Sequence, residues 1–203
     1  GPWLDEFHKQ HPDLCLGLSE YGCEAVLRWH TEKPKMGDYS EEYQAYYHRR
    51  MLETFDTRPY LWSTHVWNMF DFASDMRDEG GLKGRNDKGL VTFDRKTKKD
   101  TFYLYKAWWS KEPFVHIAGK RFYKRTGDHA TIQVYSNRPN IELYVGGKLL
   151  AKQDGAKTFS FDVPLKRFGK TQLRAVSGTC SDEASFRRVQ KPEREYALDT
   201  ASD

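Results

Sequence analysis

Leu-Cys-Leu-Gly-Leu-Ser-Glu-Tyr-Gly, residues 14–22, is a short apolar run that ends abruptly in polar residues and a glycine. The apolar part, Cys15–Leu18, predicts a buried strand, and Glu20 follows close behind it. In a barrel of parallel strands, catalytic residues lie at the C-terminal ends of the strands. Glu20 is therefore the first candidate for a catalytic carboxylate.

The segments that follow alternate between helical and strand patterns. A helix is expected over residues 3–11, and a long helix is expected to begin at Ser40, whose hydroxyl can cap it, and to end at Arg58-Pro59. The β-branched and aromatic residues 60–72 predict a second buried strand, and a further helix is expected over residues 101–110. Strands that alternate with helices and long loops are typical of a parallel sheet.

Three local expectations concern burial. The basic run at residues 95–99 is expected to form a solvent-exposed turn, and Cys15 and His65 are expected to be core residues of the two strands. The helix that begins at Ser40 is expected to bury one apolar face, because apolar residues recur at intervals of three and four. That face consists of Tyr43, Tyr46, Tyr47, Met51, Leu52 and Phe55.

The composition changes at Lys111-Glu112-Pro113. Beyond this point, short alternating segments are separated by turn signals, and Val145-Gly146-Gly147-Lys148 is a strong hairpin signal. Regular short strands at this spacing predict a β-sandwich. Its strands are expected at residues 114–117, 131–136, 141–145, 158–163, 172–176 and 184–189.

The composition excludes several classes of function. The 33 basic and 29 acidic residues are interleaved, which is typical of a solvated surface and not of a nucleic-acid interface. Three cysteines without a close pair indicate neither a disulfide framework nor a zinc site, and no apolar stretch is long enough to span a membrane. We therefore expect no cofactor, no metal, no nucleic-acid partner and no membrane partner.

Four residues are expected to face one cavity. Glu20 ends the first predicted strand, Trp67 lies near the end of the second, and Asn86 and Lys88 lie in the loop that follows. A buried carboxylate beside an aromatic wall, as expected for Glu20, can attack or stabilise a cationic sugar carbon, as in glycoside hydrolysis. The alternatives are a strand-end ion pair for Glu20 and a loop-bracing ion pair for Lys88. Glu24 ranks below Glu20, because it lies four residues beyond it.

These motifs resemble those of glycoside hydrolase family 2. Leu-Gly-Leu-Ser-Glu-Tyr-Gly at 16–22 looks like the family's nucleophile motif, and the resemblance covers residues 3–112 closely. The further motifs, in order, are Trp-Asn-Met-Phe-Asp-Phe at 67–72, Arg-Asp-Glu-Gly at 77–80, Asn-Asp-Lys-Gly-Leu-Val-Thr-Phe-Asp-Arg-Lys at 86–96, Lys-Asp-Thr-Phe-Tyr at 99–103 and Tyr-Lys-Ala-Trp-Trp-Ser at 105–110.

The resemblance implies a chain of two fold classes, α/β plus all-β. Residues 1–112 would form the last strands and helices of a (β/α)8 TIM barrel, containing only the seventh and eighth of its eight strands. Residues 113–189 would form an immunoglobulin-like β-sandwich, and residues 190–203 a polar tail.

The resemblance also implies a retaining β-glycosidase, most like the bacterial β-galactosidases, that hydrolyses terminal β-D-galactosides through a covalent glycosyl-enzyme intermediate. Glu20 matches the nucleophile, and Trp67 matches the aromatic residue that packs on the sugar. Asn86 and Lys88 match an Asn-x-Lys motif that contacts the sugar carboxylate in the β-glucuronidase branch. The same context, residues 85–91, also looks common among β-galactosidase-like members, so β-glucuronidase specificity is the alternative.

One element of the family is missing from the sequence. The family's acid/base catalyst is a Glu that follows an Asn, and the chain contains no Asn-Glu dipeptide. We therefore expect an enzyme fragment with little activity alone, which needs the remainder of the barrel, can self-associate as a homo-oligomer and belongs in a bacterial cytoplasm. The alternative is a non-catalytic carbohydrate-binding or spacer module, with Phe122, Tyr123, Tyr135 and Tyr144 of the sandwich as candidate sugar contacts.

Overall fold

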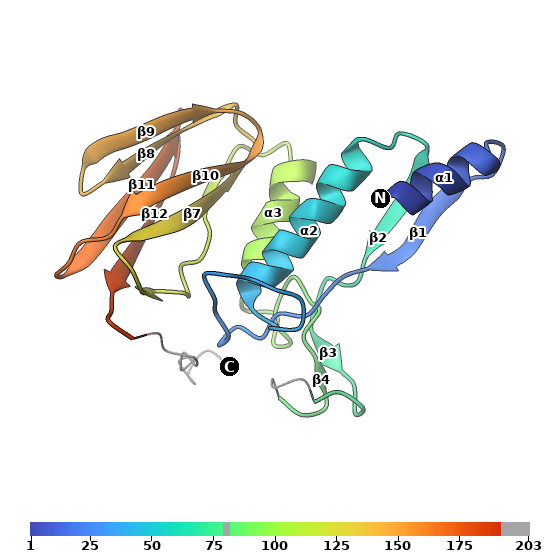
Figure 1. Ribbon diagram of the computed structural model, residues 1–203, viewed down its shortest axis with the longest axis horizontal. Helices are drawn as coiled ribbons and strands as arrows, with labels where there is room; N and C mark the ends of the chain where they lie inside the picture. The colour runs from blue at the N-terminus through green and yellow to red at the C-terminus, as the bar shows by residue number, and fades with distance from the viewer. Residues whose placement is uncertain (79–81, 192–203) are drawn as a thin grey trace.

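The computed structural model describes residues 1–78 and 82–191. It contains both helices and strands, and its sheets are open, as Figure 1 shows for the described part of the chain. Two predicted segments lie partly outside the described residues. They are the motif at 77–80, whose last two residues are not described, and the polar tail at 190–203, which is described only as far as residue 191.

A two-stranded parallel sheet forms in the first third of the chain. Helix α1 (Pro2–Gln10) leads into strand β1 (Leu16–Tyr21), and helix α2 (Glu41–Asp56) leads into strand β2 (Leu61–Val66). Strands β1 and β2 pair in parallel, with Tyr21 opposite Val66, which confirms the predicted strand–helix–strand order. Strand β1 runs on through Glu20, and β2 ends six residues before the predicted boundary.

Two short strands and a third helix follow. Strand β3 (Phe72–Ala73) pairs antiparallel with strand β4 (Arg85–Asn86), and helix α3 (Asp100–Trp109) lies where a helix was expected. Cys15 was expected in the core, but it precedes β1 and is exposed. His65 was also expected in the core and is exposed as well, because its side of β2 is not covered by the described residues.

Helix α2 begins as predicted, and Tyr47, Met51, Leu52 and Phe55 of its expected apolar face pack in a hydrophobic cluster with β1 and α3, but its most deeply buried side chains lie mostly beside that face. The Ser40 hydroxyl accepts a hydrogen bond from the Tyr43 backbone N–H at 3.0 Å, which confirms the cap. Tyr46, expected to be buried, is 45% exposed. The most deeply buried side of the helix is largely polar, and its side chains form hydrogen bonds to neighbouring segments. It consists of Glu41, Gln44, Ala45, His48 and Leu52.

Two sheets of mostly antiparallel strands make up the second half. The first has the order β10–β7–β5, and the second has the order β6–β12–β11–β8–β9, with β6 paired in parallel to β12. The bounds are β5 (Val115–Ile117), β6 (Lys124–Arg125), β7 (His129–Ser136), β8 (Asn140–Val145), β9 (Lys148–Asp154), β10 (Lys157–Pro164), β11 (Lys170–Ser177) and β12 (Cys180–Arg188).

The two sheets share one hydrophobic core. Ile132 of β7, Leu143 of β8 and Phe186 of β12 are buried within it. The six predicted strands and the hairpin at Gly146-Gly147 are all present. Strand β9 was missed because it is an edge strand whose side chains are mostly exposed, so its sequence lacks a clear alternation of apolar and polar residues.

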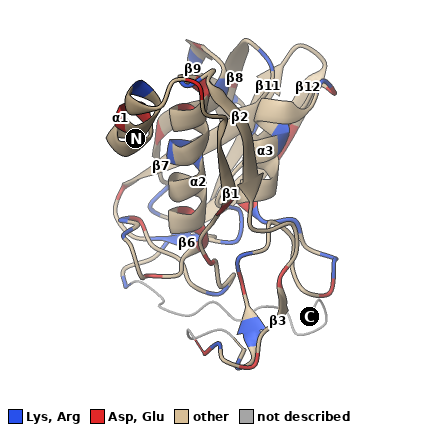
Figure 2. Cartoon of the chain, turned by 90° about the vertical axis from the view of Figure 1, so that its right-hand side faces the viewer, with Lys and Arg blue, Asp and Glu red and all other residues tan. Residues whose placement is uncertain are grey.

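A second core joins the helices to the strands of the second half. It contains Tyr21 of β1, Leu52 of α2, Leu104 of α3 and Tyr135 of β7. Figure 2 shows α2 directly beside the β1–β2 pair. The domain boundary predicted near residue 112 stays a prediction, and a packed interface crosses it.

Two further findings concern the described residues. None of their helices combines the length and the hydropathy needed to cross a bilayer. Among residues 1–78 and 82–191, no three His, Cys, Asp or Glu side chains lie close enough together to hold a metal ion.

Candidate active site

Three loops meet at the C-terminal ends of β1 and β2. The Trp67 backbone N–H donates to the Tyr21 carbonyl oxygen at 2.8 Å, and the Ala25 N–H donates to the Asp87 carbonyl oxygen at 3.0 Å. The Leu90 N–H donates to the Asn68 carbonyl oxygen at 3.1 Å. These bonds place the segments that carry Glu20, Trp67 and residues 86–88 side by side, as the sequence predicts.

Glu20 is the last residue but one of β1. Tyr21 is buried and packs on Phe55 of α2, with ring centroids 4.9 Å apart. Because successive side chains of a strand point to opposite faces, Glu20 lies on the face away from α2. Its carboxylate is exposed, not buried as expected. Within residues 1–78 and 82–191 it forms no ion pair, so the alternative of a strand-end ion pair finds no partner there.

Trp67 begins the loop after β2, and its peptide bond to Asn68 is cis. Its side chain is 43% exposed and meets Phe72 edge-on, with ring centroids 5.8 Å apart. A Cβ atom added at Gly22 would collide with the Trp67 carbonyl oxygen. The glycine after the Glu20 motif is therefore required for the close approach of the two strand ends.

Asn86 and Lys88 differ in their surroundings. Asn86 is 4% exposed, and its Oδ1 accepts a hydrogen bond from the Lys88 backbone N–H at 3.0 Å, so it shapes the loop. The Lys88 side chain is half-buried and forms no ion pair in the described part of the chain. Burial raises the pKa of the neighbouring Cys23 to about 12, and the Lys88 charge opposes that rise. The described residues therefore give Lys88 no partner for the loop-bracing ion pair that was its alternative role.

The lysine that braces the loops is Lys99, which was expected in an exposed turn. Lys99 is fully buried, and its Nζ donates to Asp71 Oδ1 at 2.8 Å. It also donates to the carbonyl oxygens of Ala25 at 2.9 Å and Asp87 at 2.8 Å. Lys99 and these three partners, here called the Lys99 cluster, join all three loops of the site. The signal for Lys99 was its place in a family motif, since its charge alone indicated exposure.

Two acidic residues near the site have structural partners. Burial raises the pKa of Asp71, and its Oδ1 also accepts the Gly89 backbone N–H at 2.8 Å. Glu24 is 5% exposed and lies 3.5 Å from Arg77 Nη1, so it is held in an ion pair. Unlike Asp71 and Glu24, Glu20 has an exposed carboxylate that a substrate can reach.

The comparisons with known proteins point to glycosidases. No family model matches the chain. A β-glucuronidase of Bacteroides fragilis is 44% identical over 164 residues, which is 78% of this chain and 24% of that protein. A putative β-glucuronidase of Formosa agariphila is 30% identical over 214 residues, covering 87% of this chain and 25% of that protein.

Solved structures with a similar fold also carry the names of glycosidases. An FMN-binding β-glucuronidase from Faecalibacterium prausnitzii L2-6 superposes with a TM-score of 0.91 at 52% identity, covering 94% of this chain and 29% of that one. A putative β-galactosidase from Bacteroides fragilis gives a TM-score of 0.88 at 36% identity, covering 96% and 31%. The chain is a homologue of these glycosidases.

The glycosidase homologue spans about a quarter of the length of the curated relatives that it matches. The recognition made from its motifs is confirmed, and the homologues are consistent with part of a glycoside hydrolase family 2 protein. The roles of Glu20, Trp67, Asn86 and Lys88 stay predictions, because no comparison tests individual residues.

Proposed function

We propose that this chain supplies the nucleophile half of the active site of a retaining β-glycosidase. One observation carries the proposal: the parallel pairing of β1 and β2 and the bonds between their loops bring Glu20, Trp67 and Lys88 to one edge of the sheet. Glu20 attacks the anomeric carbon, Trp67 packs on the sugar ring, and Asn86 holds the loop that presents Lys88.

A retaining mechanism needs a second carboxyl group about 5–5.5 Å from the nucleophile. Glu24 does not fit this role, because it is buried and paired with Arg77. We propose that the proton donor lies in another part of a longer protein, because this chain matches only about a quarter of the length of its relatives. The open face of β1 and β2, on which His65 is exposed, is where the rest of a (β/α)8 barrel would pack.

The substrate that we favour is a β-D-glucuronide. The sequence motifs alone favour a β-D-galactoside, but the curated relatives named above are β-glucuronidases. Lys88 is half-buried and forms no ion pair with the described residues. Its ammonium group is therefore suited to bind the sugar carboxylate. The putative β-galactosidase among the similar structures keeps the galactoside as the second candidate.

The test compares two substrates. In the full-length protein that carries this chain, Lys88→Met should lower kcat/KM for an aryl β-D-glucuronide about 100-fold, because a charge-assisted contact contributes about 1.5–3 kcal/mol. Turnover of the matching galactoside should change less than threefold. Lys83→Met, at an exposed position on the other side of β4, is the control. An equal loss for both substrates would refute the carboxylate contact.

A second candidate function is flavin binding, because the Faecalibacterium relative is described as FMN-binding and is 52% identical to this chain. FMN has a phosphate, a ribityl chain with three hydroxyls and a flat ring. Its binding would be measured by quenching of flavin fluorescence as the chain is added. Quenching that does not saturate would exclude this function.

The carbohydrate-binding alternative stays a prediction, and its four candidate sugar contacts differ in exposure: Tyr123 and Tyr144 are partly exposed and line one surface pocket, whereas the other two are buried. Phe122 is 6% exposed and Tyr135 is 3% exposed, so these two candidate sugar contacts offer no platform on the surface. Tyr135 lines a pocket between α2 and β7 instead.

A further inference from the structure

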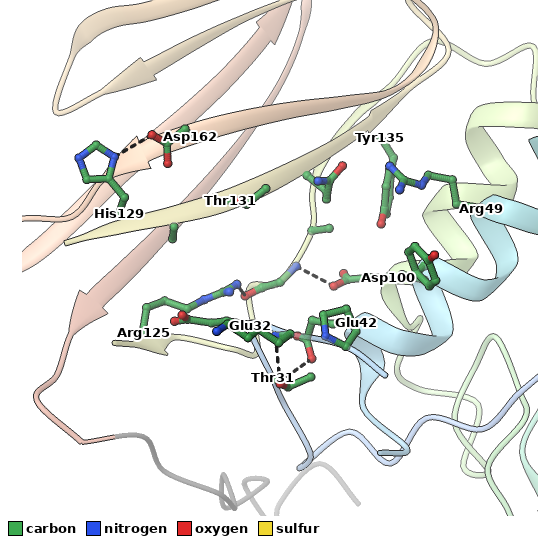
Figure 3. A pocket seen from close by; sticks show the side chains of 18 residues that line it. Thr31, Glu32, Glu42, Arg49, Asp100, Arg125, His129, Thr131, Tyr135 and Asp162 are labelled. Carbon is green, nitrogen blue, oxygen red and sulfur yellow. Dashed lines mark hydrogen bonds and ion pairs between the residues drawn. The ribbon is translucent and has the colours of Figure 1, made fainter. Parts of the chain in front are cut away.

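A cavity of about 500 Å³ lies between α2 and the β7–β10 face, outside the candidate active site. Figure 3 shows its position, with α2 on one side, β7 and β10 on another and the segment of Thr31 and Glu32 below. A volume of several hundred Å³ is typical of sites for small ligands. Neither Glu20 nor Trp67 lines it.

Three polar groups that line this cavity form no hydrogen bond with the described residues, and two of them, on Gln133 and Arg49, are buried atoms. Gln133 Oε1 and Arg49 Nε are buried atoms that form no hydrogen bond, and the carboxylate of Glu53 lies 3.8 Å from Arg49 Nε. Tyr135 is 97% buried, and its hydroxyl forms no hydrogen bond with residues 1–78 or 82–191. Figure 3 shows Arg49 extending toward Tyr135. A buried polar group without a partner costs about 1–3 kcal/mol, which a bound ligand can recover.

The carboxylates that line the cavity are already engaged. Glu42 accepts a hydrogen bond from the Thr31 backbone N–H at 3.2 Å, and Asp100 accepts one from the Gly119 N–H at 2.6 Å. Glu32 accepts the Thr126 N–H at 3.1 Å. Their negative charge disfavours a simple anion such as inorganic phosphate, whereas the groups that form no hydrogen bond include both donors and an acceptor.

Hydroxyl groups can donate and accept at once, so a polyhydroxylated ligand satisfies both kinds of group. Tyr46, which lines the cavity and is 45% exposed, adds an aromatic surface against which a ring can pack. We propose that this cavity binds a polyhydroxylated small molecule that contains a ring, through Arg49, Gln133 and Tyr135. The sugar of a glycan and the ribityl-flavin part of FMN share this chemistry, and the FMN phosphate is not part of the proposed contacts. The FMN candidate rests on the second candidate function proposed above.

The test uses the whole chain and three probes: methyl β-D-galactopyranoside, FMN and inorganic phosphate, each titrated by calorimetry and by ligand-observed NMR. We expect the galactoside or FMN to bind, and phosphate not to bind. Arg49→Met should weaken binding about tenfold and Tyr135→Phe about fivefold, since each removes one hydrogen-bonding group. The matched controls Arg50→Met and Tyr60→Phe lie outside the cavity and should change affinity less than twofold.

Three results would overturn the proposal. The first is no binding of either ring probe, and the second is binding that survives both Arg49→Met and Tyr135→Phe. The third is equal competition by phosphate, which would indicate a plain anion site. Glu20→Gln should leave binding intact; if it abolishes binding, the ligand sits at the candidate active site and the cavity is excluded.

Discussion

Lys99 is the residue on which the arrangement of the candidate site depends most. Its ammonium group has no exposure, and all of its contacts are to loops that follow β1, follow β2 or precede α3. A buried charge is tolerated when hydrogen bonds surround it. Those bonds make Lys99 a positioning residue for loops that carry the proposed substrate contacts.

Lys99→Met should lower the free energy of unfolding by about 3–5 kcal/mol, because it leaves the Asp71 carboxylate buried without its cation. Urea denaturation followed by fluorescence measures the loss. The neighbouring Lys98→Met is the control, since Lys98 is exposed and a change there should stay within about 0.5 kcal/mol. If Lys99→Met is as stable as Lys98→Met, the Lys99 cluster does not hold the loops.

His48 should make stability depend on pH. Burial lowers its pKa to about 3 from the ordinary 6.5, and its Nδ1 lies 2.8 Å from the Tyr105 hydroxyl. A base whose pKa falls on folding favours the folded state fully above the unfolded pKa, and that stability is lost as pH falls from about 6.5 toward 3.

Between pH 7 and pH 5 the protein should lose about 2 kcal/mol through His48. His48→Gln should flatten this part of the pH profile, measured as the free energy of unfolding in urea at each pH. His129→Gln, at an exposed histidine, should leave the profile as it is. A profile that is equally steep in His48→Gln would show that other groups cause the pH dependence.

At the scale of elements, the signals for helix caps and tight turns are confirmed, whereas the burial of single side chains was often predicted wrongly. Ser40 as a helix cap and the Gly146-Gly147 hairpin are encoded by neighbouring residues. Lys99, by contrast, bonds to Ala25, which is 74 positions away. The placement of Glu20 and Trp67 at one edge followed from strand order, whereas the burial of Lys99 depended on contacts that no local pattern encodes.

The contact between the end of β1 and the loop after β2 depends on Gly22. Gly22→Ala should lower the free energy of unfolding by about 1–3 kcal/mol, because a Cβ at this position meets the Trp67 backbone. Thermal melts measure the effect. Gly155→Ala is the matched control, since its Cβ would meet only ordinary contacts, the nearest at 3.4 Å. Equal melting temperatures would show that the strand ends can separate without cost.

At the scale of the whole molecule, a buried ionic network joins the helices to the second half of the chain. The Arg121 guanidinium donates to both carboxylate oxygens of Glu41 at the start of α2 and lies 3.5 Å from Asp100 at the start of α3. Asp100 also lies 3.0 Å from His116 Nε2 of β5. These contacts, with the second core, hold the two halves together.

Arg121→Met should therefore separate the unfolding of the two halves. The loss of a cation that faces two buried carboxylates costs about 3–5 kcal/mol. Calorimetry should then show two transitions, the later one from the sandwich strands, which have a core of their own. Arg174→Met, at an exposed ion pair of 3.9 Å, should leave one transition. A single unshifted transition in Arg121→Met would mean that the network does not couple the halves.

The central claim, that Glu20 is the nucleophile, is tested most directly by trapping the covalent intermediate. The full-length protein that carries this chain is incubated with a 2-deoxy-2-fluoro β-glucuronide that has a good leaving group, and its peptides are mapped by mass spectrometry. The account predicts one added glycosyl mass on the peptide that contains Glu20, and none in Glu20→Gln. A label on Glu24 or elsewhere, or turnover that survives Glu20→Gln, would contradict it.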